Sequence, residues 1–225
     1  MDILRTKLTV LLLGLMTAGS ATAGNDLWLG VKAGTLGLGL ETIWRPIPLL
    51  DLRAGFNRYE YEDVGSQAGV NYDATLQLDT YYVTANFLFP VSPFRITAGA
   101  FSNRNELQMA STTQTSFDIG DFPYTPAQVG TLRSTTYFED VAPYLGVGFD
   151  FSIAGKVGLN LDFGVLWQGE PLVTLTSDGT LATDPSPVGD FFRQNLEEER
   201  LQLETEFEDY KAFPVMSLGF TFNFF

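Results

Sequence analysis

The chain has 225 residues, of which 45% are hydrophobic and 14% aromatic, and it contains no histidine and no cysteine. Their absence excludes Ser–His and Cys–His catalysis, zinc sites built on those ligands, and a disulfide framework. The formal net charge of −14 argues against nucleic acid as a partner and against attraction to anionic lipid headgroups. Because the chain contains neither histidine nor cysteine, we expect no enzyme activity, no metal and no cofactor.

The N-terminal residues have the features of a secretory signal peptide. Arg5 and Lys7 precede an apolar run from Leu8 to Met16, and small residues follow up to Ala21-Thr22-Ala23. The apolar run is too short to span a bilayer comfortably. A buried N-terminal helix would need a polar face, which this run does not offer. We therefore predict a cleaved signal peptide at residues 1–23.

Cleavage near Ala23–Gly24 would leave one domain at residues 24–225, a normal length for a single domain. No later segment approaches the roughly twenty consecutive apolar residues that a transmembrane helix requires. The sequence thus excludes a helical membrane protein and predicts an exported chain whose stability does not come from disulfides.

From Leu27 onward, apolar residues alternate with polar or small residues, which is typical of β-strands. In Val157–Trp167 the odd positions are all apolar, whereas the even positions include Gly, Asn and Asp. The predicted strands are Leu27–Ala33, Leu36–Trp44, Leu50–Tyr61, Tyr72–Phe89, Phe94–Gln108, Val141–Phe151, Val157–Gln168 and Val215–Phe225.

Three features indicate that the apolar faces of these strands contact lipid rather than a soluble core. The polar faces carry Gly, Asn and Asp instead of the Lys, Thr and Glu typical of solvated strands. The strands have the roughly ten residues that a tilted strand needs to cross a bilayer, and aromatic residues gather near their ends. Because unpaired backbone groups are not tolerated in hydrocarbon, the sheet must close. We predict an all-β protein, a closed antiparallel transmembrane barrel of about eight strands.

Turn residues predict which connections are short. The turns at 44–48, 90–93 and 152–156 are short and are expected in the periplasm, together with both chain ends. The long connections, at about 62–71, 109–140 and 169–212, are then expected outside the cell. Two points stay open: one unbroken strand from 27 to 44 is nearly as plausible, and segment 109–140 could extend the fifth and sixth strands beyond the membrane.

A helix is predicted at about 190–211, immediately before the last strand. Apolar residues from Phe192 to Tyr210 recur at helical spacing, with Asp190 as the N-cap and Pro214 as the stop. The other faces are rich in Glu and are interpreted as solvated. Alternatively, the helix caps or enters the barrel mouth, or its carboxylates hold divalent cations at the lipopolysaccharide surface. No Asp-x-Asp-x-Asp-Gly loop supports a specific calcium site.

The last residues form a pattern of their own. Ser217 is followed by Gly219, Phe222 and Phe224 at alternate positions and by the terminal Phe225. This pattern resembles the β-signal read by the barrel-assembly machinery, which the resemblance implies as a partner during biogenesis.

The whole mature chain resembles the small eight-stranded outer-membrane proteins typified by the OmpA transmembrane domain, OmpX and OmpW. It is most similar to uncharacterised proteobacterial barrels that end in a helix and a strand of the form Pro-Val-x-Ser-Leu-Gly, present here at Pro214–Gly219. The resemblance implies a location in the Gram-negative outer membrane. It supplies no ligand-binding residue.

If the apolar residues face lipid, the opposite face of each strand lines the barrel interior. Charged residues of that parity are Lys32, Glu41, Asp51, Arg53, Arg95, Asp150 and Asp162, accompanied by Asn57, Asn86, Asn160 and Asn223. So narrow a barrel is filled by its own side chains. Because a buried charge needs a partner, we expect Arg53 and Arg95 to bond with Glu41, Asp51 or Asp162.

Two functions remain compatible with this interior. The first is a structural or surface-interaction protein with an occluded barrel, in contact with outer-membrane lipid and lipopolysaccharide and expected to be a monomer. The second is a narrow channel or carrier for small solutes, gated by the interior Arg–carboxylate pairs or by the helix at 190–211.

Overall fold

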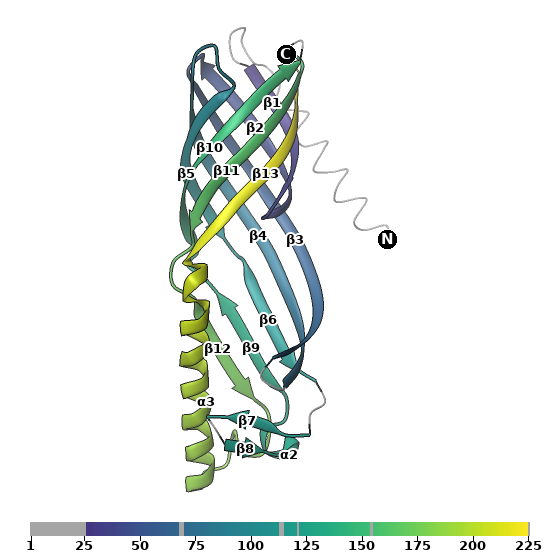
Figure 1. Cartoon of the computed structure of the whole chain (residues 1–225), viewed down its shortest axis with the longest axis vertical. Coiled ribbons are helices and arrows are strands. Elements are labelled where there is room, and N and C mark those ends of the chain that lie inside the picture. The colour runs from purple at the N-terminus through teal and green to yellow at the C-terminus, as the bar shows by residue number, and fades with distance from the viewer. Residues whose placement is uncertain (1–25, 68–69, 113–114, 121, 154, 225) are drawn as a thin grey trace.

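The computed structural model describes residues 26–67, 70–112, 115–120, 122–153 and 155–224 (Figure 1). Within these ranges, no helix combines the length and the apolar character needed to span a membrane. The predicted signal peptide and Phe225 lie outside the described residues.

Eight antiparallel strands form a closed barrel, as predicted. Neighbouring strands are joined mostly by hairpins, and the last strand pairs with the first, from Trp28↔Asn223 to Gly34↔Ser217. The strands, in their order around the barrel, are β1 (Asp26–Gly34), β2 (Gly37–Ile47), β3 (Leu50–Gln67), β4 (Val70–Leu88), β5 (Phe94–Asn103), β10 (Val141–Ile153), β11 (Val157–Trp167) and β13 (Ala212–Asn223).

The two faces of the barrel wall differ as the alternation predicts. Large apolar side chains such as Val83, Phe163 and Phe220 are exposed on the outside of the barrel, whereas their strand neighbours of opposite parity are buried or half-buried. An outward apolar band is the surface that hydrocarbon requires of a transmembrane barrel. Asp26 and Phe224 mark the terminal end of the barrel, and the opposite end is called the extended end below.

Residues 27–44 form two strands rather than one. β1 ends at Gly34 and β2 begins at Gly37, whose φ of +96° is accessible to glycine and strained for other residues. Thr35 fixes the turn, because its hydroxyl donates to the carbonyl oxygen of Pro214 at 3.0 Å and accepts from the amide of Met216 at 3.1 Å.

The prediction of a long loop at 62–71 is wrong. β3 continues to Gln67 and β4 begins at Val70, and the two strands stay in register up to the pair Gln67↔Val70. The acidic residues of this segment suggest a loop, but they lie on strands that extend beyond the barrel and therefore remain solvated.

Segments 109–140 and 169–212 also contain more structure than loops. Three short strands continue the barrel wall as an open sheet, paired in the order β4–β6–β9–β12. The predicted fifth strand divides at Arg104-Asn105, where β4 changes partner from β5 to β6. The added elements are β6 (Glu106–Ser111), β7 (Phe117–Ile119), β8 (Phe122–Tyr124), α2 (Pro126–Val129), β9 (Leu132–Tyr137) and β12 (Leu172–Ser177). We call β3, β4, β6, β9 and β12 beyond the barrel the outer sheet.

The helix before the last strand is present, with different ends. α3 spans Pro187–Glu206 and a 3-10 turn, η1, spans Phe207–Lys211. The N-cap is Ser186 rather than Asp190, because the Ser186 hydroxyl accepts the Gly189 amide at 3.4 Å and Pro187 occupies the first turn. Pro214 does not stop the helix, since β13 already begins at Ala212.

Candidate functional site

The seven charged residues predicted for the interior all lie on the inner side of the barrel wall. Glu41, Asp51, Arg53 and Arg95 are buried there. Asp150 and Asp162 are more accessible and pair with these arginines, and Lys32 is half-buried. The seven charges come from β1, β2, β3, β5, β10 and β11, and contacts form both between neighbouring strands and across the interior.

Arg95 is the centre of the network. It has no exposed surface, and its Nε donates to Asp150 Oδ1 at 3.0 Å while its Nη2 donates to Asp162 Oδ1. Its Nη1 donates to Asn86 Oδ1 at 2.9 Å and to Thr97 Oγ1 at 2.5 Å. Every guanidinium nitrogen is therefore satisfied, which is the condition under which a buried charge is tolerated.

Arg53 forms the second part of the network. Its Nε donates to Asp51 Oδ1 at 3.2 Å and its Nη2 donates to Asp150 Oδ2 at 2.7 Å. Arg45, which the sequence reasoning missed, approaches Asp51 at 3.7 Å from the terminal end. Asp150 thus bridges both interior arginines, a role that the sequence did not indicate.

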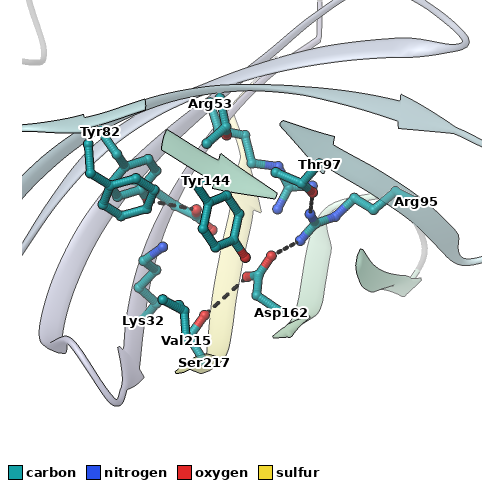
Figure 2. Close-up of a pocket in the computed structure, with 12 residues that line it drawn as sticks. Lys32, Arg53, Tyr82, Arg95, Thr97, Tyr144, Asp162, Val215 and Ser217 are labelled. Carbon is teal, nitrogen blue, oxygen red and sulfur yellow. Dashed lines mark hydrogen bonds and ion pairs between the residues drawn. The ribbon is translucent and has the colours of Figure 1, made fainter. Parts of the chain in front are cut away.

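Glu41 forms no ion pair with either arginine. One of its oxygens, Oε2, instead accepts the Tyr82 hydroxyl at 3.1 Å, and Lys32 Nζ lies 4.1 Å from the centre of the Tyr82 ring. Within the described residues, Glu41 Oε1 and Arg53 Nη1 are buried without a hydrogen-bond partner. Both residues line a small cavity of about 20 Å³, which has room for about one water molecule. Figure 2 shows this cavity and the contacts of Arg95 and Asp162 beside it.

An aromatic layer lies inside the barrel beyond the charges, toward the extended end. Tyr82 stacks on Phe101 with ring centres 5.0 Å apart, and the ring centres of Phe101 and Tyr144 are 5.2 Å apart. Leu36 and Val215 pack into the same cluster. This layer was not predicted from the sequence, because only the charged residues and asparagines were assigned to the inner face. Its signal was available: Phe101 shares the strand parity of Arg95.

α3 covers one edge of the outer sheet. It packs on β12 and β7 beyond the barrel, and it does not enter the barrel (Figure 1). Arg200 Nη1 donates to the carbonyl oxygen of Val173 at 3.3 Å, and Glu204 Oε1 accepts the Val173 amide at 3.2 Å. The hydrogen bond from Arg200 lowers the pKa of the Glu197 carboxyl. The helix thus satisfies backbone groups of β12 that have no strand partner, one way of protecting a sheet edge.

A second apolar cluster fixes α3 to the hairpin at the far end of the molecule. Phe192 has no exposed surface and packs with Ile119, Tyr124 and Val129. Asn195 is buried beside it and donates to the Tyr124 hydroxyl at 2.8 Å. Of the predicted apolar stripe, Phe192 and Leu196 therefore pack in this outer cluster, whereas Tyr210 is exposed.

The residues of the predicted β-signal occupy both faces of β13. The Ser217 hydroxyl donates to Asp162 Oδ2 at 3.1 Å, and Gly219 lies beside Glu41, whose Oε1 would be 3.4 Å from an added Cβ. Phe222 and Phe224 are exposed on the outer face. The polar and small positions of the pattern thus line the interior, and its aromatic positions face outward.

Solved structures with a similar fold are known. The crystal structure of Acinetobacter baumannii CarO is similar with a TM-score of 0.56 and 22% identity, covering 88% of this chain and 97% of that one. This chain has the fold of a small outer-membrane β-barrel. CarO2 from the same organism gives the same TM-score and identity, covering 88% of this chain and 98% of its own.

Other comparisons add less to the outer-membrane barrel assignment. The N-terminal barrel domain of Pseudomonas aeruginosa OprF gives a TM-score of 0.33 at 11% identity, covering 89% of this chain and 96% of that domain, and nothing is inferred from it. No protein-family model and no curated protein matches the sequence. The likeness therefore concerns the architecture of the outer-membrane barrel and assigns no activity.

The edge-covering contact of α3 is testable. Changing Glu204→Ala removes the acceptor of the buried Val173 amide, and an unsatisfied buried donor costs about 1–3 kcal/mol. We expect hydrogen exchange at Val173 to accelerate by about tenfold or more, measured on the refolded protein. Glu206→Ala, at an exposed position of the same helix, is the control and should leave exchange unchanged. Unaltered exchange in Glu204→Ala would show that α3 does not protect β12.

Proposed function

We propose that this protein is an integral outer-membrane protein of a Gram-negative bacterium, whose barrel is a closed anchor and whose outer sheet and α3 form a surface for interactions outside the cell. The observation that carries the closed anchor is the filled barrel: the Arg53–Asp150–Arg95 network and the Tyr82–Phe101–Tyr144 layer lie one above the other.

The orientation follows from the connections. The turns near 48–49, 89–93 and 155–156 are at the terminal end, and short turns are periplasmic in such barrels. The outer sheet, α3 and the hairpin β7–β8 would then lie outside the cell. Lipid would contact the outward apolar band, and lipopolysaccharide would surround the base of the outer sheet.

The biogenesis expected of such a protein fits the chain. The signal peptide at 1–23 would direct export, and the pattern ending in Phe225 would be read by the barrel-assembly machinery. β13 carries this pattern and closes the barrel by pairing with β1. The barrel wall needs no second copy for closure, which supports a monomer. We propose no catalytic role, since the chain contains neither histidine nor cysteine.

A narrow channel is the second candidate, and one observation favours it. Glu41 Oε1 and Arg53 Nη1 are buried without partners beside a cavity that Lys32 also lines. Exchange of partners among these groups would let Arg53 move away from Asp51 or Asp150 and admit water. The aromatic layer argues against a continuous path, because it lies between this cavity and the extended end.

Single-channel recording in planar bilayers tests the closed anchor directly. We expect no conductance steps from the refolded protein or from Arg53→Ala, because the aromatic layer stays intact in both. We expect the same result when residues 190–211 are deleted, because α3 lies outside the barrel. Arg133→Ala, which changes an exposed arginine of the outer sheet, is the matched control.

The recordings separate the two candidates. Steps that appear in the wild type and change in Arg53→Ala, but not in Arg133→Ala, would replace the closed anchor with a gated channel. Heat-modifiable migration on a gel shows that each sample contains folded barrel, so silent traces are not attributed to misfolded protein.

A further inference from the structure

The two edges of the outer sheet differ. The β12 edge is covered by α3, whose Arg200 and Glu204 bond with the backbone of Val173. The opposite edge belongs to β3 and begins where β2 ends its pairing, at Leu38↔Arg58. From Tyr59 to Gln67, β3 is paired with β4 on one side only, and within the described residues no other backbone group bonds to this stretch.

This free edge, the β3 edge (Tyr59–Gln67), is long and regular. At about 3.3 Å per residue it presents roughly 30 Å of backbone. Its register with β4 is unbroken from Tyr59↔Leu78 to Gln67↔Val70, without the bulge that often protects an edge. A strand of this kind presents N–H and C=O groups to which an extended chain can pair.

The side chains of the β3 edge select the charge of its partner. Glu60 and Glu62 are exposed on the outer face of the sheet, and Asp63 is exposed on the inner face. Within the described residues, none of the three carboxylates forms an ion pair, although Asp63 Oδ1 accepts the Val64 amide at 2.9 Å. Arg58, at the start of the edge, is the nearest cation on the same strand.

A second copy of this chain is a poor occupant. Pairing of one β3 edge with another would bring Glu60 and Glu62 close to the carboxylates of the partner, and like charges on facing strands destabilise a sheet. Acidic side chains therefore protect this edge against self-association. The same carboxylates attract a strand that carries cations, and Tyr59 and Tyr61, both about half exposed, offer apolar contact on the inner face.

We propose that the β3 edge binds an extended basic segment of a protein or peptide as an added strand of the outer sheet. The segment carries Lys or Arg at alternate positions opposite Glu60 and Glu62 and apolar residues opposite Tyr59 and Tyr61. This inference rests on the proposed surface-interaction role and names the class of partner for it.

Binding of a synthetic probe tests the charge requirement. The probe is a short peptide in which lysine alternates with valine, added to the refolded full chain in detergent and followed by fluorescence anisotropy. Removing two opposite-charge cross-strand pairs in Glu60→Gln/Glu62→Gln should weaken binding by about fivefold or more. The control Glu198→Gln/Glu206→Gln removes the same charge from exposed positions of α3 and should bind as the wild type does.

Backbone methylation of the probe tests strand addition itself. Only alternate N–H groups of an added strand face its neighbour. Two probes, N-methylated at alternate residues of opposite parity, should therefore differ: one should lose binding and the other should retain it. Equal affinities for the two, or no binding of the parent peptide, would overturn the proposal. Such a failure is distinct from failure of the closed anchor, because peptide binding and bilayer conductance are measured independently.

Discussion

Replacing Arg95 by alanine is expected to lower the free energy of unfolding by about 3–5 kcal/mol, because Asp162 loses its ion-pair partner and Asp150 keeps only Arg53 of its two arginines. Arg95 is fully buried and pairs with both Asp150 and Asp162. Urea unfolding of the refolded protein, followed by tryptophan fluorescence and by heat-modifiable migration, measures the loss.

Two further variants make this expectation specific. Arg133→Ala removes an exposed ion pair, whose side chains are 55% and 51% accessible, and should cost less than about 1 kcal/mol. Arg95→Met/Asp162→Asn removes charge on both sides and should be more stable than Arg95→Ala. If Arg95→Ala unfolds at the same urea concentration as Arg133→Ala, the interior network does not stabilise the barrel.

Replacing Phe192 by alanine is expected to release α3 from the far end of the outer sheet. Phe192 has no exposed surface, and truncation of a buried phenylalanine costs about 3–5 kcal/mol. The loss is local, since the cluster around Phe192 belongs to β7, β8, α2 and α3 and not to the barrel. We expect rapid proteolysis within 187–206, while the barrel keeps its heat-modifiable migration.

The neighbouring residue supplies the control. Phe191 is 43% exposed and contacts Phe122 edge to face at 5.0 Å between ring centres. Phe191→Ala removes a side chain of the same size and should raise the proteolysis rate far less. Equal rates in the two variants would mean that the Phe192 cluster does not hold α3 in place.

The barrel could be predicted from the sequence because one physical constraint repeats along the chain. A side-chain period of two, with one face in hydrocarbon, assigns Arg53, Arg95 and Asp162 to the interior without knowledge of which strands are neighbours. The inner-face residues taken from the sequence were the charged residues and asparagines, so Phe101 was left out although its parity is that of Arg95. Parity was the better guide than polarity at that position.

The pairing inside the barrel could not be predicted. Arg53 on β3 and Asp150 on β10 are not on adjacent strands and meet across the interior. Such a contact depends on the tilt and stagger of the whole barrel, which no local pattern contains. The contact between Arg45 and Asp51 was missed for a different reason, since Arg45 was assigned to a turn.

The outer sheet was predicted only in part, through the alternative in which segment 109–140 extends the fifth and sixth strands, because its signals are weak when taken one strand at a time. Its strands β6, β9 and β12 are short, and Glu60, Glu62 and Asp63 make the end of β3 read as a loop. These segments become strands because β4 continues past the barrel and offers them an edge. The N-cap of α3 was predicted at Asp190, four residues after the observed Ser186. Ser186-Pro187 is the stronger start signal, but the apolar stripe, on which the prediction relied, begins later.

β4 belongs both to the barrel, where it pairs with β5, and to the outer sheet, where it pairs with β6. A partner on the outer sheet would therefore be held at a fixed height and angle above the bilayer, because the sheet is a rigid continuation of the barrel and not a domain on a flexible linker. A rigid binding surface loses little conformational freedom when a partner binds, which lowers the entropic cost of binding. It would also transmit a pull on the partner along the strand directly into the membrane-embedded wall.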